Sequence, residues 1–273
     1  MKTSHFEPEK LIDTLRSSRK YRDLDLPYDF LHDVLLTESG NSQDATMIEA
    51  KFRKKVHEVI APYLETINYT KEAAALQEFF QEHPLSSSRE YCTSILSRHS
   101  STQERLQHLD QLYPALFDIT GKPRLLVDLA CGLNPFSLPW MGLDTATRYF
   151  AYDIHKPRVD LVNQFFSIMG FEPLAIHQDF LLHPPGLIPD VTFIFKEIHR
   201  IEKRKAGAVK AFLGAYRSVW VILSLPDTDL KGHHDLRSQH RLLVERCIPK
   251  NYNYVHELSL GSESFYFLRL IDG

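Results

Sequence analysis

Cysteine is scarce in this chain. Its 273 residues include three cysteines, Cys92, Cys131 and Cys247, which lie far apart in the sequence. They form no paired spacing of the kind that binds zinc, and no framework for disulfides. We therefore interpret them as reduced thiols, and we expect a cytoplasmic protein.

Long apolar runs are also missing. No stretch of about 18 apolar residues occurs, which argues against a transmembrane helix, and residues 1–10 lack the apolar core of a secretion signal. Hydrophobic residues nevertheless make up 43% of the chain, enough to bury a sizeable core. We expect one large folded domain or two of ordinary size, without a membrane partner.

An excess of positive charge is absent too. The formal net charge is −3 at pH 7, which argues against a protein that coats nucleic acid indiscriminately. Any RNA-binding site must then come from local clusters of lysine and arginine. Two such clusters occur, at 51–55 and 196–210, and a solvated helix face is the alternative interpretation of each.

The first 121 residues predict a helical region. Apolar residues recur there at helical spacing, and Pro27, Pro84 and the serines at 86–88 mark breaks. The predicted helices cover residues 7–18, 28–36, 44–67, 71–81, 88–97 and 102–118. Ser101 or Thr102, followed by Glu104, predicts the N-cap of the last of these helices.

From residue 122 onward, short β-branched and aromatic runs alternate with helical segments. The predicted strands cover residues 124–130, 148–154, 172–178, 191–195 and 219–225, and strands 254–259 and 264–270 form a hairpin around Leu260-Gly261. This pattern predicts a mostly parallel, doubly wound α/β sheet. We expect a helical domain at 1–121 and an α/β domain at 122–273.

A ligand site is predicted where the first strand ends. Small residues at Ala130 and Gly132 let a ligand approach the backbone at the carboxyl end of a central strand, where open α/β sheets bind ligands. Asp128, near the end of the strand, can hold the loop or approach a ligand's amino group. This spacing is a weak signal by itself, and an ordinary strand and turn is an equal alternative.

Two further acidic residues strengthen this prediction. The second strand ends in Asp153, which can accept hydrogen bonds from both hydroxyls of a ribose; an N-cap for the helix starting near Lys156 is the alternative. The third strand is followed by Asp179 and Phe180, which can bind an adenine amino group and cover its face. The absence of Gly-x-Gly-x-x-Gly and Walker motifs favours S-adenosylmethionine over a dinucleotide or ATP.

Three remaining features carry weaker signals. Lys196, at the end of the fourth strand, can hold RNA phosphate or a target base, or it can be a solvated lysine. Cys131 is interpreted as a small loop residue rather than a nucleophile. His233, His234 and His240 lack the regular spacing of a metal site, so we predict no metal.

Several motifs spread over nearly the whole chain resemble one enzyme family. They are His99-Ser100-Ser101-Thr102-Gln103-Glu104-Arg105-Leu106, Leu109-Asp110-Gln111-Leu112-Tyr113, the stretch 127–135, Tyr152-Asp153-Ile154-His155, Gln178-Asp179 and Ile194-Phe195-Lys196. Together they resemble the aminoglycoside-resistance 16S rRNA methyltransferases that modify guanine N7 at the ribosomal decoding site. The pairing of Ser-Thr-x-Glu-Arg with Ala-Cys-Gly-Leu-Asn-Pro is specific, because general methyltransferases share the sheet but not these two motifs.

The resemblance implies a class I methyltransferase with a Rossmann-like, seven-stranded sheet. The sheet would bind S-adenosylmethionine, and the helical N-terminal domain would dock on 16S rRNA in the 30S subunit. Arg105 would reach the methionine carboxylate of the cofactor, for which a guanidinium fork is suited; pairing with a helix acid is the alternative. The expected consequence is aminoglycoside resistance, and we expect a monomer.

Two groups of site residues are expected. The cofactor-binding group is Thr102, Arg105, Asp128, Ala130, Gly132, Asp153, Ile154, Gln178, Asp179, Phe180 and Phe195. The RNA-binding group is Lys51, Arg53, Lys54, Lys55, Lys196, Arg200, Lys203 and Lys205. No general base is expected, because guanine N7 has a lone pair and no proton, so alignment and exclusion of water suffice.

Two stretches depart from the family pattern, at 197–205 and 227–234, near the expected target-base side. Three alternatives therefore stay open. A diverged homologue would methylate another RNA position. A small-molecule methyltransferase would need a closed apolar pocket and no lysines at 51–55, whereas a non-catalytic ribosome-binding protein would tolerate loss of Asp153.

Overall fold

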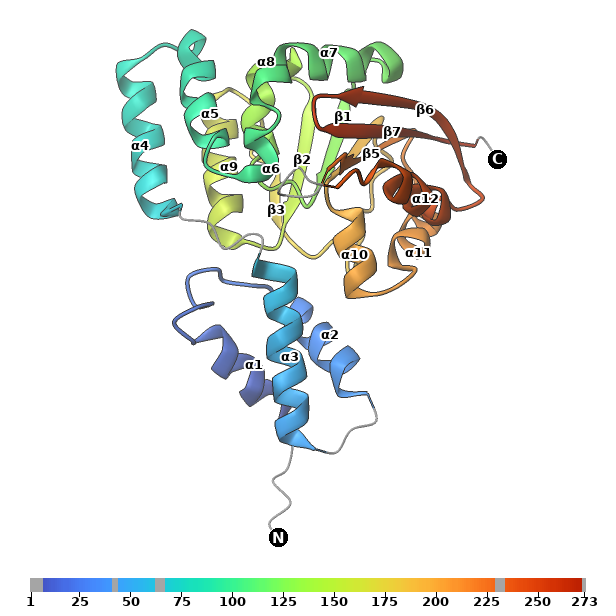
Figure 1. Cartoon of the computed structure of the whole chain (residues 1–273). Helices are drawn as coiled ribbons and strands as arrows, with labels where there is room; N and C mark the ends of the chain where they lie inside the picture. Colours follow the sequence, from blue (N-terminus) through green and yellow to red (C-terminus); the bar gives the residue numbers. More distant parts are fainter. Residues whose placement is uncertain (1–6, 41–43, 62–66, 229–233, 272–273) are drawn as a thin grey trace.

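The structure is a computed structural model that describes residues 7–40, 44–61, 67–228 and 234–271 (Figure 1). Within these ranges, a central sheet carries helices on both faces, and a group of helices lies apart at the N-terminal end. Residues 62–66 of the helix predicted at 44–67, and His233, lie outside the described ranges. No helix in the described parts of the chain is long and apolar enough to cross a membrane.

The N-terminal helices form a unit with its own hydrophobic core. They are α1 (Pro8–Arg16), α2 (Tyr28–Ser39) and α3 (Ala45–Ile60). The Asp44 side chain begins α3 by accepting hydrogen bonds from two backbone amides of the first turn. The buried face of α3 then repeats at helical spacing through Ile48, Phe52, Val56 and Ile60. These residues pack with α1 and α2 in a cluster separate from those of the sheet.

The next helices pack on the sheet instead. They are α4 (Tyr69–Glu82), α5 (Ser88–Leu96) and α7 (Leu109–Thr120), and their buried residues share one cluster with α9 (Lys156–Ile168) and the sheet. The hydrophobic cores therefore divide between α3 and α4. The predicted change from helices to strands after residue 121 is present as well, since the first strand begins at Leu125.

The single helix predicted at 102–118 is wrong. The segment consists of α6 (Ser100–Gln103), the 3-10 turn η3 (Leu106–His108) and α7 (Leu109–Thr120). The Thr102 hydroxyl donates to the Leu96 carbonyl oxygen at 2.6 Å, which ties this residue to the end of α5. Such side-chain bonds compete with a continuous helix, and helical periodicity does not reveal them.

The predicted N-cap at Ser101 or Thr102 is also wrong. His99 caps α6, because its Nδ1 accepts the backbone N–H of Ser101 at 3.2 Å. The Glu104 carboxylate pairs instead with Lys196, which follows β4. Histidine is not among the usual capping residues, so this cap could not be recognised from the residue type.

The sheet has seven strands in the order β3-β2-β1-β4-β5-β7-β6. Their bounds are β1 (Leu125–Leu129), β2 (Arg148–Asp153), β3 (Ala175–His177), β4 (Val191–Phe195), β5 (Trp220–Pro226), β6 (Tyr252–Leu260) and β7 (Glu263–Leu270). The first five strands are parallel to one another, and β7 is antiparallel to β5 and β6. The strand order reverses between β1 and β4, so the ligand crevice is expected at their carboxyl ends.

Alternate strand residues enter two different layers. On β1, Val127 and Leu129 face the cluster of α10 (Ile198–Arg204), α11 (Ala208–Ala215) and α12 (Arg237–Cys247), whereas Leu126 faces the opposite cluster. Figure 1 shows the corresponding helices on the two sides of the sheet. The short elements η2 (Leu85–Ser87), η4 (Asn134–Ser137) and α8 (Leu138–Met141) complete the described fold.

The tip of the β6–β7 hairpin approaches the broken helical segment closely. Gly261 has a φ of +63°, and a Cβ there would lie 2.5 Å from Nε2 of His108. Glycine therefore satisfies both the turn and the close approach. Just beyond this turn, Glu263 lies on the same face of β7 as the buried Phe265 and Phe267. The hairpin thus places the buried Glu263 close to η3.

Candidate functional site

Two adjoining pockets lie at the carboxyl ends of the parallel strands. The narrow pocket is lined by the residues that follow β2 and β3, including Asp153 and Asp179. The wide pocket is lined by Arg105, the loop after β1 and the residues that follow β4. Ala130, Glu197 and Arg200 line both pockets. The strand-end residues predicted from the sequence therefore surround one continuous site.

Every member of the predicted cofactor-binding group except Asp128 lines one of these pockets. The narrow pocket contains Ala130, Asp153, Ile154, Gln178, Asp179 and Phe180. The wide pocket contains Thr102, Arg105, Ala130, Gly132 and Phe195. Asp128 is buried within β1 instead.

The backbone is unusual at both sides of the strand reversal. Ala130 after β1 and Lys196 after β4 have φ values of +53° and +56°, in the left-handed region that non-glycine residues seldom adopt. Lys196 is held there by its backbone N–H, which donates to the Oγ of Ser224 at 3.1 Å. Strained backbone of this kind persists where surrounding contacts enforce it, and it clusters at functional sites.

Asp153 joins the loop after β1 to the end of β2. Its Oδ2 accepts hydrogen bonds from the backbone N–H of Gly132 and from Nη1 of Arg158, each at 3.0 Å, and its Oδ1 accepts the N–H of His155 at 2.9 Å. Burial alone would raise the pKa of Asp153, but the Arg158 charge and these hydrogen bonds lower it below its usual value. The helix-capping alternative does not apply, because His155 caps α9.

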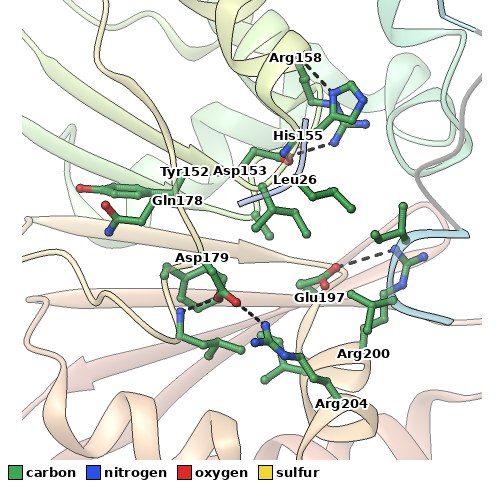
Figure 2. A pocket seen from close by; sticks show the side chains of 17 residues that line it. Leu26, Tyr152, Asp153, His155, Arg158, Gln178, Asp179, Glu197, Arg200 and Arg204 are labelled. Carbon is green, nitrogen blue, oxygen red and sulfur yellow. Dashed lines mark hydrogen bonds and ion pairs between the residues drawn. The ribbon is translucent and has the colours of Figure 1, made fainter. Parts of the chain in front are cut away.

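Asp179 lies on the other side of the narrow pocket (Figure 2). Its Oδ1 accepts the N–H of Leu181 at 3.0 Å, and its Oδ2 accepts Nη1 of Arg204 at 2.6 Å. In the view of Figure 2, Leu26 lies between Asp153 and Asp179. The two acids therefore face a pocket with an apolar wall.

Arg105 is buried and bound in a fork to an acid of the hairpin. Its Nε and Nη2 donate to the two carboxylate oxygens of Glu263 at 2.7 and 2.6 Å, and its Nη1 donates to Oδ1 of Asn134 at 3.2 Å. The pairing considered from the sequence was with a helix acid, whereas the partner belongs to β7. Burial would raise the pKa of Glu263, but the charges of Arg105 and Lys196 lower it.

Asp128 holds the loop after β1 from inside the sheet. Its Oδ2 accepts hydrogen bonds from Nδ2 of Asn134 and from the hydroxyl of Tyr149, both at 2.8 Å. Burial raises the pKa of Asp128 to about 7, although these two hydrogen bonds act to lower it. Of the two roles considered for Asp128, this contact corresponds to support of the loop.

The predicted RNA-binding residues of the second cluster differ in exposure. Lys196 is buried, with its Nζ paired to Glu104 and 3.5 Å from Oε2 of Glu263. Arg200 and Lys203 line the wide pocket. Lys205 is exposed, and it lines neither of these two pockets of the described structure.

The basic residues of α3 lie beside this second cluster. Lys51 and Lys54 are exposed, whereas Nε of Arg53 pairs with Glu49 at 2.7 Å. Nζ of Lys55 donates to the backbone oxygen of Lys203 at 2.8 Å, which links α3 to α10. Two basic clusters that are far apart in the sequence thus meet in the fold.

The site also contains a cysteine and several histidines. Burial raises the pKa of the Cys131 thiol well above its usual value, which fits the interpretation as a small loop residue. His234 and His240 line the wide pocket. Across the described ranges, no group of three or more His, Cys, Asp or Glu side chains could hold a metal ion.

Sequence reasoning missed the residues that pair with the predicted ones. Glu263, Arg158 and Arg204 each form an ion pair with a predicted cofactor-binding residue. A signal for Glu263 exists, because an acid on the same strand face as two phenylalanines requires a buried partner. Arg204 lies four residues after Arg200 on α10, so it shares the helix face that lines the pocket.

A family model connects the chain to known proteins. The model described as ribosomal RNA methyltransferase (FmrO) matches residues 17–241, which is most of the chain. The resemblance found in the sequence motifs is thereby confirmed.

Two relatives are similar over most of their length. A protein from Serratia marcescens named 16S rRNA (guanine(1405)-N(7))-methyltransferase is 27% identical over 259 residues, which cover 94% of this chain and 96% of the relative. A protein of the same name from Micromonospora rosea is also 27% identical, over 86% of each chain.

Solved structures share the fold. The 16S rRNA methylase RmtB is similar with a TM-score of 0.79 at 25% identity, covering 97% of this chain and 99% of the other. The methyltransferase RmtF, in complex with S-adenosyl-L-homocysteine, is similar with a TM-score of 0.80 at 25% identity, covering 97% and 98%. The predicted Rossmann-like, seven-stranded methyltransferase fold with helices at its N-terminus is confirmed.

The raised pKa of Asp128 predicts a pH dependence of stability. Between the usual carboxyl value near 4 and about 7, the folded state holds a proton on Asp128 that the unfolded state has lost. The free energy of unfolding therefore falls with rising pH in this window, by up to about 1.4 kcal/mol per unit from this group, and levels off above it. Asp128→Asn should lack this decline.

Urea unfolding at several pH values measures this effect. The difference in the free energy of unfolding between Asp128→Asn and the unchanged protein should change with pH between about 4 and 7. As the pH rises, the variant should become more stable relative to the unchanged protein. The exposed Asp118→Asn on α7 is the matched control and should run parallel to the unchanged protein. Parallel curves for Asp128→Asn would contradict the raised pKa.

Proposed function

We propose a function on one premise: the chain belongs to the ribosomal RNA methyltransferase (FmrO) family. We infer that it transfers the methyl group of S-adenosylmethionine to 16S rRNA in the 30S subunit, at N7 of a guanine in the decoding site. The relatives named for guanine 1405 support this acceptor. The observation that carries the proposal is the meeting of two pocket acids and a buried guanidinium at the strand reversal.

The chemistry of the pocket residues fits S-adenosylmethionine. Oδ1 of Asp153 accepts one protein N–H, so a lone pair remains for a ribose hydroxyl. Leu26, Ile60 and Phe180 supply apolar surface for an adenine ring. Nη1 of Arg105 carries two N–H groups, and one bond to Asn134 leaves a second for the methionine carboxylate. The similar structure of RmtF with S-adenosyl-L-homocysteine supports the same ligand class.

The reaction needs positioning rather than proton transfer. When bound, S-adenosylmethionine supplies a methyl group on a positively charged sulfur. The acceptor N7 of guanine offers a lone pair, so no side chain has to remove a proton. The wide pocket has a volume of about 1000 Å³, which is sufficient for a nucleotide beside the methionine end of the cofactor. Phe195 and Lys196 border it, where they can align the base and exclude water.

We propose that residues 1–121 dock on the 30S subunit and that residues 122–273 form most of the cofactor site, to which Leu26, Ile60 and Arg105 of the first region contribute. The exposed Lys51 and Lys54 on α3 support this docking role, since phosphate contacts dominate affinity for RNA and are sensitive to salt. Arg200 and Lys203 extend the basic surface to the mouth of the wide pocket. The chain would act as a monomer in the cytoplasm, where its rRNA substrate is located.

The ribose role of Asp153 predicts weaker cofactor binding after substitution. Asp153→Asn should reduce the affinity for S-adenosylhomocysteine about 10- to 100-fold in calorimetry, because a charge-assisted hydrogen bond to a hydroxyl is lost. The variant also leaves Arg158 buried beside a neutral amide. The double variant Asp153→Asn, Arg158→Met removes both charges. It should therefore be more stable to unfolding than Asp153→Asn alone, while its affinity for S-adenosylhomocysteine stays low. Unchanged affinity in both variants would remove the ribose role.

The acceptor is tested in a susceptible bacterium. Expression of the chain should confer resistance to 4,6-disubstituted aminoglycosides and should add N7-methylguanine to 16S rRNA, detected by mass spectrometry. The Asp153→Asn, Arg158→Met double variant serves as the inactive control. Purified enzyme should prefer intact 30S subunits to free rRNA and to small molecules. Cofactor binding without resistance or rRNA modification would favour a diverged homologue.

The docking role of α3 predicts a loss specific to the RNA substrate. Lys51→Glu with Lys54→Glu should lower kcat/KM for 30S subunits at least about tenfold and flatten its salt dependence, because two phosphate contacts are lost. Affinity for S-adenosylhomocysteine should stay unchanged. Lys55 is left intact because it binds the backbone of α10. Lys250→Glu is the control, an exposed lysine outside both clusters; equal activity in all three proteins would refute docking through α3.

A further inference from the structure

The N-terminal unit forms part of the wall of the narrow pocket. Leu26, Val59 and Ile60 line this pocket together with Asp153 and Asp179 of the sheet. Leu26 and Ile60 are each 2% exposed and belong to the core of α1–α3. The unit proposed to dock on RNA therefore also supplies the apolar surface opposite the two pocket acids. A movement of this unit would change the shape of the pocket.

One arginine connects that wall to a pocket acid. Nη1 of Arg204 donates to Oδ2 of Asp179 at 2.6 Å, and Nη2 donates to Oδ2 of Asp33 on α2 at 2.8 Å. The guanidinium carbon also lies 4.9 Å from the centre of the Phe30 ring. The planar guanidinium thus binds the α/β domain with one nitrogen and the N-terminal unit with another.

The other polar contacts between these parts are more exposed. The ring of His183 pairs with Asp29, with exposed side-chain fractions of 57% and 43%. By contrast, the side chains of Arg204 and Asp33 are 11% and 33% exposed, and that of Asp179, the other partner of Arg204, is 3% exposed. Exposed ion pairs contribute little, whereas a buried charge that loses its partner is strongly unfavourable. The bond from Lys55 to the backbone of Lys203 is exposed too, so among the described contacts Arg204 is the most buried polar link between the two parts.

We propose that Arg204 is a positioning residue for the cofactor. It fixes the Asp179 carboxylate toward the adenine amino group, and it holds α2 so that Leu26 and Ile60 close the adenine side of the pocket. This inference rests on the proposed function, because it takes the narrow pocket to bind adenosine. Since docking and the pocket wall share the N-terminal unit, cofactor and 30S subunit each strengthen the binding of the other, by the same factor.

Calorimetry with S-adenosylhomocysteine tests the positioning role. Arg204→Met should raise the dissociation constant about 10- to 100-fold, because Asp179 loses its partner and the wall loses its attachment. Arg204→Lys should recover part of the affinity, since one ammonium can replace only one arm of the fork. Arg16→Met is the matched control, because Arg16 pairs with Asp25 inside the N-terminal unit. It should leave the dissociation constant unchanged.

Asp33→Asn separates the two arms of the link. This variant leaves the bond between Arg204 and Asp179 in place, so it should raise the dissociation constant of S-adenosylhomocysteine only a few-fold. In the unchanged protein, saturating 30S subunits should tighten S-adenosylhomocysteine binding about fivefold or more. In Asp33→Asn, 30S subunits should tighten S-adenosylhomocysteine binding much less. A purely structural role of Asp33 would not produce this loss of coupling.

The outcomes distinguish this inference from the proposed function. If the unchanged protein binds S-adenosylhomocysteine but Arg204→Met binds it equally well, the positioning role is refuted and the methyltransferase proposal stands. A fall in melting temperature without a change in affinity would refute it in the same way, as would 30S subunits that leave the affinity of the unchanged protein unaltered. If the unchanged protein binds no S-adenosylhomocysteine, both proposals fail.

Discussion

The buried pair between Arg105 and Glu263 is the interaction on which the site depends. Taking two charges out of water is costly, and the cost is recovered only when the geometry is good and both partners are present. Here the pair is forked, with both side chains nearly inaccessible. Its members lie 158 residues apart in the sequence, so it fixes the hairpin tip against the segment before α7. The glycine turn at Gly261 and the interruption of the predicted helix are both consistent with this approach.

The same rule governs the acids of the narrow pocket. Asp153 and Asp179 are buried, and each is paired with an arginine of a following helix, Arg158 or Arg204. For Asp153 the Arg158 charge lowers the pKa against the effect of burial, so this carboxylate remains an acceptor toward a ligand at neutral pH. Asp128 shows the opposite case. Its nearest partners are neutral, its pKa is raised to about 7, and it serves the loop rather than the pocket. Charge pairing thus separates the two pocket acids from the supporting Asp128.

The strands and the strand-end positions were predictable because both follow local patterns. Runs of β-branched and aromatic residues gave seven strands, and parallel strands bring their carboxyl ends to one edge, which placed Asp153 and Asp179 together. The interruption at 102–118 was not predictable from periodicity, since it depends on contacts of Thr102 with another helix. The pairing partners were missed for the same reason. Arg204 lies within a charged run that resembles a solvated helix face until its two acids are located in space.

Helix α10 gives the departures at 197–205 a physical meaning. The Lys55 ammonium of α3 donates to the backbone of this short polar helix at Lys203. The helix also places Arg204 beside the narrow pocket, and its Arg200 and Lys203 border the wide pocket. The N-terminal unit, the narrow pocket and the wide pocket therefore meet on one element. A substitution on α10 therefore reaches all three, whereas the exposed Lys51 and Lys54 on α3 line neither pocket. Changes of target within this family would accordingly be expected in α10, while the strand-end acids stay constrained by their buried partners.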